Sequence, residues 1–127
     1  HEYTHGVIQA FDVIHITNEA LTLDESFADI FGAMVEFYGL GGSGDYQIGE
    51  DFILVPDVIR DFQNPKSRND PDTYNGTYWK SGTTPVQEIV HDNTGVQNHA
   101  FYLLAEGGSG TNDNGENYNV TGIGRDK

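Results

Sequence analysis

The segment DESFADIFGAMVEFYG, residues 24–39, constrains the fold more than any other part of this sequence. Its acidic residues and one glycine recur at i, i+4, i+7 and i+11, which is one stripe of a helix: Glu25, Asp29, Gly32 and Glu36. Apolar residues occupy both flanking faces. We predict a helix with Asp24 as its N-cap and Gly39 as its end. Like charges at this spacing repel, so the stripe requires cations or imidazolium groups beside it.

The charge balance narrows the possible partners. The chain has 20 Asp and Glu against 6 Lys and Arg, and no Lys or Arg precedes Arg60. Nucleic acids are excluded as partners, and anionic membranes are disfavoured, because both require a basic face. Bound divalent cations would neutralise the acidic excess, and a solvated acidic surface is the alternative. The absence of Cys excludes disulfides and thiolate metal sites.

The first residues, HEYTHG, carry a metal-binding pattern. His1 and His5 lie four apart, so on a helix both project from one face, and Glu2 lies beside them. Such a motif also arises by coincidence, but the acidic stripe supplies what the motif lacks. Glu25 can be a third zinc ligand, and Asp29, one turn later, can hold the far nitrogen of a ligating histidine. The alternative is an exposed acidic helix face.

The remaining chain predicts few regular elements. Residues 1–10 and 92–107 read as helices, whereas residues 52–81 and the Gly- and Asn-rich tail from 108 to 127 read as irregular loops. No domain boundary is evident over residues 1–127. The expected fold class is therefore mainly α with long irregular loops, in a single partial domain.

Six motifs together resemble one known family. In chain order they are HEYTHG, LDESFADIFGAMVEFYG, IGEDF, RDFQNP, DPDTY and VHDNTGVQNHAFYLLAEGG. They are similar to motifs of the thermolysin family of zinc metalloendopeptidases. The resemblance implies part of a thermolysin-like α+β metallopeptidase catalytic domain, of the zincin, gluzincin type. It also implies a secreted enzyme that cleaves peptide or protein substrates beside bulky apolar residues.

The same resemblance implies a role for individual residues. The zinc ligands would be His1, His5 and Glu25. The other implied roles are Glu2 as general base, His91 as oxyanion stabiliser, Asp29 as the partner of His1 and Arg60 as a substrate-binding residue. Calcium would stabilise the protein through the side chains of Glu36, Asp45 and Glu50 and the backbone carbonyl of Gln47, because hard oxygen ligands suit that ion.

Several positions depart from the family pattern. Ile16 stands near the place of a tyrosine that assists the oxyanion site, Val86 replaces an aspartate that orients His91, and Asp24 replaces an asparagine. Glu88 is a candidate substitute for the missing aspartate. Ile16 and Val86 motivate an alternative function, a catalytically inactive metal-binding module of this fold. A further alternative is an acidic calcium-binding structural domain.

The preceding β-rich lobe and the following helices of the family catalytic domain have no counterpart in this sequence. We therefore expect a fragment of a larger protease whose partners include the missing parts of its own catalytic domain. As an isolated chain it is expected to be a poor peptidase.

Overall fold

The computed structural model describes residues 1–11, 17–49 and 58–125, and this part of the chain is mainly helical. Its helices are α1 (Glu2–Ala10), α2 (Asn18–Gly39), α3 (Val86–Asp92), α4 (Thr94–Glu106) and the short 3-10 helix η1 (Pro65–Arg68). Two antiparallel strand pairs are formed by β1 (Gln47–Ile48) with β2 (Arg60–Asp61), and by β3 (Gly108–Thr111) with β4 (Asn117–Val120). Long connections separate these elements, so the prediction of a mainly α fold with irregular loops is confirmed.

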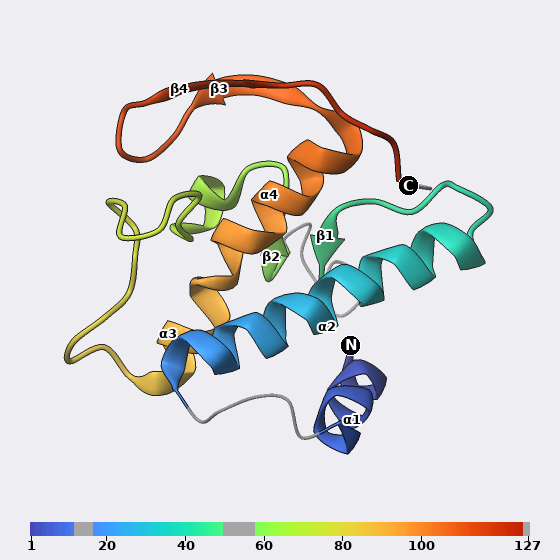
Figure 1. Ribbon diagram of the computed structural model, residues 1–127, viewed down its shortest axis with the longest axis horizontal. Coiled ribbons are helices and arrows are strands. Elements are labelled where there is room, and N and C mark those ends of the chain that lie inside the picture. Colours follow the sequence, from blue (N-terminus) through green and yellow to red (C-terminus); the bar gives the residue numbers. More distant parts are fainter. Residues whose placement is uncertain (12–16, 50–57, 126–127) are drawn as a thin grey trace.

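Helix α2 runs through the middle of the molecule, with α1 on one side and α3 and α4 on the other (Figure 1). It begins earlier than predicted, because Thr17 rather than Asp24 is the N-cap and its side chain accepts a hydrogen bond from the Ala20 N–H at 3.2 Å. Asp24 therefore lies within the helix. The predicted end at Gly39 is confirmed.

The C-terminal half contains a helix and a hairpin that the sequence did not predict, and the short helix η1 lies within the stretch predicted as irregular. The expected helix over 92–107 is α4, which ends before Gly107, but α3 precedes it as a separate helix. The tail, predicted as a polar loop, is instead the β3–β4 hairpin, which lies beyond the end of α4 (Figure 1). In the turn of this hairpin, the backbone N–H of Asp113 donates to Asp72 Oδ1 at 2.8 Å. This bond attaches the hairpin to the loop after η1.

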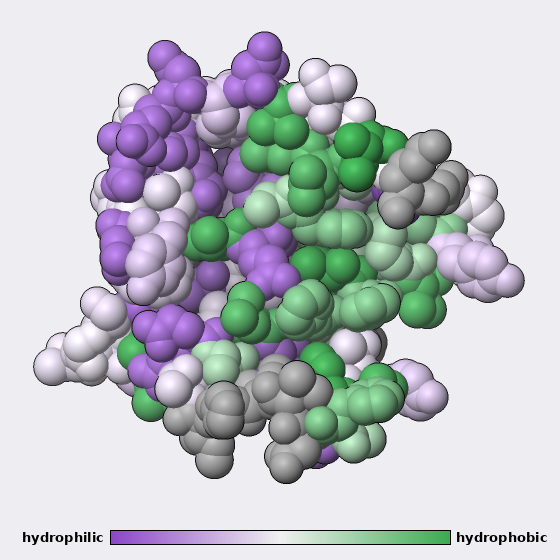
Figure 2. Space-filling model, viewed as in Figure 1, coloured by the Kyte–Doolittle hydropathy of each residue, from purple (hydrophilic) through white to green (hydrophobic). Residues whose placement is uncertain are grey.

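The hydrophobic core is small and lies between α2, β2 and α4. Ile30, Ala33 and Phe62 are buried together, with Met34, Tyr46, Ile48, Phe101 and Tyr102 packed around them. In Figure 2, apolar residues gather on the part of the surface where α2 and the end of α4 lie, and hydrophilic residues gather over η1 and the hairpin turn. None of the described helices has the length and apolar character needed to cross a membrane.

Candidate metal centre

Helices α1 and α2 bring His1, His5 and Glu25 to one point. His1 Nε2 lies 3.1 Å from His5 Nε2 and 3.3 Å from Glu25 Oε2, and the distance from His5 Nε2 to Glu25 Oε2 is 3.7 Å. Among the described residues, this is the one group of three or more His, Asp or Glu whose potential ligand atoms all lie within 4.8 Å of one another. The helical spacing of the two histidines and the position of Glu25 on the facing helix produce this convergence.

These three atoms have the separations that a tetrahedral metal ion requires. Ligand atoms bound to zinc at about 2.0–2.1 Å lie roughly 3.3–3.4 Å apart, and the observed distances span 3.1 to 3.7 Å. Glu25 Oε2 is buried and accepts no hydrogen bond within the described structure. An unsatisfied buried carboxylate oxygen is costly. The donor set of two imidazoles and one carboxylate therefore fits zinc.

Asp29 lies beneath His1 in a fully buried polar network. Its Oδ1 is 3.0 Å from His1 Nδ1, as the sequence predicts for the partner of a ligating histidine. Arg60 donates from Nε to Oδ2 at 2.6 Å and from Nη2 to Oδ1 at 2.5 Å. Asn98 Nδ2 also donates to Oδ2, at 2.9 Å, and Ser26 Oγ donates to Asn98 Oδ1 at 2.6 Å. The carboxylate is thereby fixed in position.

Sequence reasoning missed the supporting roles of Asn98 and Ser26. They are 72 residues apart in the chain, and only the packing of α4 on α2 brings them together. The signal available in the sequence was the presence of polar residues on the side of α4 that faces α2. The rest of that helix reads as apolar.

The charges of the centre favour ionised forms in the metal-free protein. Contact with Asp29, and after it with Glu25, raises the pKa of His1 from 6.5 to about 9. Contact with His1 lowers the pKa of Glu25, against the opposing effect of burial. Burial acts to raise the pKa of Asp29, but His1 and Arg60 together bring it below its usual value. The two carboxylates thus carry negative charge at neutral pH.

His91, on α3, approaches the same centre from a third helix. Its Nε2 lies 3.5 Å from Glu25 Oε2, and its Nδ1 lies 2.6 Å from the Gln87 carbonyl oxygen. A carbonyl oxygen only accepts hydrogen bonds, so Nδ1 carries the hydrogen and Nε2 faces the centre. The group that orients His91 is therefore the Gln87 carbonyl. The sequence had suggested Glu88 for this role. The sequence could not show this contact, because the one-turn spacing of Gln87 and His91 matters only on a helix and α3 had not been predicted.

Glu2, the predicted general base, is exposed, whereas Arg60, the predicted substrate-binding residue, is buried. Glu2 is exposed in the first turn of α1, and its side chain has no hydrogen bond or ion pair within the described residues. Arg60 is only 8% exposed and lies behind Asp29, to which both of its donating nitrogens turn. The sequence predicted contact between Arg60 and substrate, and missed its pairing with Asp29.

The residues predicted to bind calcium lie at the other end of α2. Asp45 Oδ1 accepts the Gln47 N–H at 2.8 Å. The carbonyls of Tyr46 and Ile48 accept hydrogen bonds from the β2 side, so the Gln47 carbonyl between them points away from β2. Glu36 is half-buried near the end of α2, and Glu50 lies outside the described residues, as does Ile16. The described part therefore contains three of the four predicted calcium ligands.

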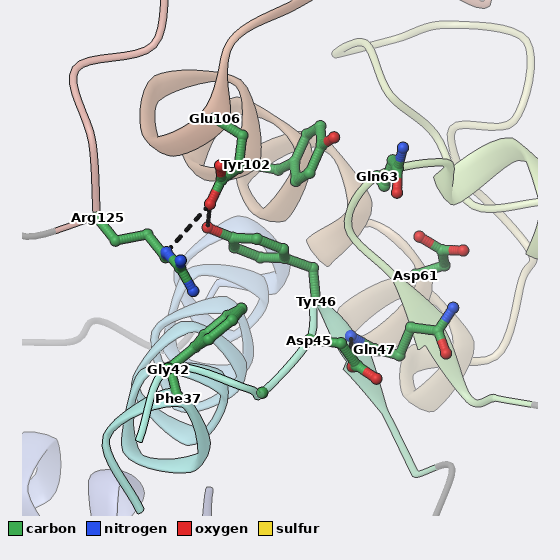
Figure 3. A pocket seen from close by; sticks show the side chains of 11 residues that line it. Phe37, Gly42, Asp45, Tyr46, Gln47, Asp61, Gln63, Tyr102, Glu106 and Arg125 are labelled. Carbon is green, nitrogen blue, oxygen red and sulfur yellow. Dashed lines mark hydrogen bonds and ion pairs between the residues drawn. The ribbon is translucent and has the colours of Figure 1, made fainter. Parts of the chain in front are cut away.

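An open pocket of about 460 Å³ adjoins this region (Figure 3). Tyr46 donates its hydroxyl to Glu106 Oε1 at 2.7 Å, and Arg125 Nε lies 3.1 Å from the same oxygen. The Arg125 guanidinium also stacks over the Phe37 ring, 4.1 Å from its centroid. None of the three residues of the metal centre lines this pocket. These contacts hold the end of the described chain against α2 and α4.

Comparison with known proteins gives the family. Over its full length the chain is 38% identical to thermolysin of Alicyclobacillus acidocaldarius subsp. acidocaldarius, and 39% identical to bacillolysin of Bacillus cereus. Over 86% of its length it is 41% identical to bacillolysin of Brevibacillus brevis. It spans only 22%, 21% and 20% of these three relatives. Because residues 14–127 also match the family described as the α-helical domain of thermolysin metallopeptidases, the chain belongs to the thermolysin family.

Proposed function

We propose that this chain carries the zinc site of a secreted metalloendopeptidase of the zincin, gluzincin type, with His1, His5 and Glu25 as ligands. The observation that supports the proposal most strongly is the convergence of two imidazole nitrogens and one buried carboxylate oxygen at separations of 3.1 to 3.7 Å. The names of the relatives, thermolysin and bacillolysin, agree with protease chemistry. The substrates are peptide bonds beside bulky apolar residues.

The surrounding residues divide the chemistry between them. Zinc bound at this centre would polarise the scissile carbonyl and acidify a water molecule. Glu2, exposed next to His1, accepts the proton of the attacking water and passes it to the leaving amine. The cationic form of His91, with its Nδ1–H held by the Gln87 carbonyl, donates from Nε2 to the developing negative charge on the carbonyl oxygen. Asp29 fixes the ring of His1, and Arg60 holds Asp29 while supporting the substrate side of the site.

We also propose a calcium site at the far end of α2, formed by Glu36, Asp45, Glu50 and the carbonyl of Gln47. Asp45 and Gln47 are adjacent in the structure, and the Gln47 carbonyl points away from the neighbouring strand. Oxygen donors of this kind suit calcium. The ion would stabilise the loop that follows α2.

Metal analysis combined with a peptidase assay of the intact protein tests the proposed function. We expect one zinc per chain and cleavage of a peptide with a bulky apolar residue, both lost in Glu25→Gln. Stoichiometric zinc without turnover would instead indicate the inactive metal-binding module. Calcium binding without zinc would contradict the proposal and indicate an acidic structural domain.

A further inference from the structure

The ring of His91 is held by the backbone of its own helix. Its Nδ1–H donates to the Gln87 carbonyl, one turn earlier in α3, at 2.6 Å. This bond fixes the ring relative to α3, but it does not place α3 in the molecule. The position of His91 Nε2, 3.5 Å from Glu25 Oε2, therefore depends on the contacts that hold α3 against α2.

Helix α3 has little stability of its own. It has only seven residues, and Pro85 precedes it without a side-chain cap. A helix of this length is not stable in water by itself, so its neighbours must hold it in place. Ile89 and Val90, each 5% exposed, are buried where α3 packs on α2. Apolar burial is non-directional, so it defines the exact position of the helix less well than hydrogen bonds do.

Asn93, at the junction of α3 and α4, supplies directional contacts. Its Oδ1 accepts a hydrogen bond from the Lys80 N–H, and its Nδ2 donates to the Lys80 carbonyl, both at 2.9 Å. The Asn93 side chain is only 2% exposed and does not cap α4. Both halves of the amide are thus bound to the backbone of one residue. This pair of bonds closes residues 80–93 into a loop that contains the whole of α3.

The backbone of His91 is tied to the same junction. Thr94, which is fully buried, donates from Oγ1 to the His91 carbonyl at 2.6 Å. The Asn93 N–H donates to the Ile89 carbonyl at 3.3 Å. Only one residue, Asp92, separates Asn93 from His91. A displacement of the junction is therefore passed directly to the ring that faces the metal centre.

We propose that Asn93 is a positioning residue for His91, which it holds at the metal centre by closing residues 80–93 around α3. The inference rests on the proposed function, in which His91 donates to the developing oxyanion, and Asn93 acts through the backbone of α3. A donor of this kind stabilises the oxyanion only at hydrogen-bond distance. A small shift of α3 therefore weakens binding of the transition state more than binding of the substrate.

The first test is steady-state kinetics of the intact protein on a peptide with a bulky apolar residue. Asn93→Ala removes both bonds to Lys80, and we expect kcat to fall roughly 10²-fold with KM little changed. Zinc should stay at one per chain. Asn93→Asp keeps the acceptor for the Lys80 N–H but loses the donor, so we expect a smaller fall in kcat.

Two control variants separate this effect from general damage to the protein. Asn114→Ala makes the same substitution at an exposed position in the turn between β3 and β4. Ala105→Gly, in the last turn of α4, weakens a buried helical position and should lower Tm. Both control variants should keep the parent kcat.

Two further measurements do not require turnover. The first compares a peptide analogue that carries a tetrahedral phosphonate with a peptide thiol that binds zinc without a tetrahedral centre. Asn93→Ala should weaken the phosphonate about as much as it lowers kcat/KM, and it should leave the Kd of the thiol unchanged. The second is amide hydrogen exchange, which should become faster in α3 but not in α1.

The outcomes distinguish the role of Asn93 from the proposed function. Parent values of phosphonate affinity and α3 exchange in Asn93→Ala, alongside loss of zinc in Glu25→Gln, would overturn the role of Asn93 alone. Equal weakening of the phosphonate and the thiol would also overturn it, because a merely structural residue has that effect. If Asn93→Ala does not fold, parent phosphonate affinity in Asn93→Asp overturns it. Retention of zinc by Glu25→Gln at the parent affinity would overturn the proposed function itself.

Discussion

The acidic residues at the two ends of α2 have different surroundings. In its N-terminal half, Glu25 and Asp29 face the histidines of α1, and helical spacing on both elements fixes the atoms that converge. At its C-terminal end, Glu36 lies on the helix, but Asp45 and Gln47 come from the loop and from β1. A site between two helices is therefore determined by their packing, whereas a site on a loop depends on the path of the chain.

The two ends also differ in how their charge is balanced. Arg60 inserts beside Asp29 and forms two hydrogen bonds with it, so part of the acidic charge is neutralised within the protein. Asp45, in contrast, is exposed and accepts a hydrogen bond only from a backbone N–H among the contacts of the described residues. The comparison indicates that the N-terminal half of α2 is pre-organised, whereas Asp45 at the other end is open to solvent and to the calcium ion proposed above.

The largest expected effect is on catalysis and concerns Glu2. Glu2→Gln keeps the ligands of the metal but removes the general base, so kcat/KM of the intact protein should fall roughly 10²–10⁴-fold. Zinc content should stay at one per chain. Glu19→Gln is the matched control and should retain full activity, because Glu19 is exposed in the first turn of α2. Parent-level turnover by Glu2→Gln would rule out the assigned base.

The next largest effect is on stability and tests the asymmetry between the two ends of α2. Asp29→Ala leaves the buried Arg60 guanidinium without its partner, which should cost about 3–5 kcal/mol in the free energy of unfolding. Asp45→Ala, at the other end, should change that free energy by about 0.5 kcal/mol or less without calcium. Urea unfolding of both variants in the presence of chelator measures the difference. Equal losses of unfolding free energy in the two variants would contradict the difference between the two ends of α2.

A second buried acid, whose pKa is raised and not lowered, provides the contrast to Asp29. Asp70 is 4% exposed, and burial, followed by the charge of Asp92, raises its pKa from 3.8 to about 7. The unfolded chain therefore releases this proton at lower pH than the folded protein. Stability should decrease as the pH rises from about 4 to about 7 and then level off.

Asp70→Asn should remove this part of the pH dependence and stabilise the protein at pH 8 by on the order of 1–3 kcal/mol. At pH values below the unfolded pKa the variant and parent should be similar. Thermal unfolding across this range measures the effect. A variant that is less stable than the parent at pH 8 would show that the charged form of Asp70 is stabilising.

The smallest expected effect is that of calcium. Binding to the folded state alone stabilises by about 1.4 kcal/mol when free calcium is ten times Kd. Chelation with a calcium-selective agent should therefore lower Tm by a few degrees, and Glu36→Gln should abolish the response. An unchanged melt after calcium removal, with zinc retained, would indicate that this end of α2 is merely solvated.

The sequence predicted the parts of this molecule that depend on local spacing. The convergence of His1, His5 and Glu25, and the position of Asp29 behind His1, follow from residues four apart on two helices. Contacts between distant segments were not predictable. Asn98 reaches Asp29 only because α4 packs on α2, and Arg60 reaches it from β2, although the sequence suggested a substrate contact.

The errors in the predicted secondary structure had local physical causes. Asp24 resembles an N-cap, but Thr17 caps a longer helix, which turns Asp24 toward His5. The Gly- and Asn-rich tail has low strand propensity. Nevertheless, the backbone of β3 pairs with that of β4, from Gly108 opposite Val120 onward, and forms a hairpin. In the first case an earlier cap outweighed the one predicted, and in the second the backbone pairing across one turn outweighed low strand propensity.

The central claim, that α1 and α2 form one zinc site, is tested most directly by anomalous X-ray diffraction from crystals of the zinc-loaded protein. We predict one strong zinc peak, about 2.0–2.1 Å from Nε2 of both His1 and His5 and about 2.0–2.2 Å from a carboxylate oxygen of Glu25. A zinc peak elsewhere on the protein, or no peak after loading with equimolar zinc, would contradict the claim.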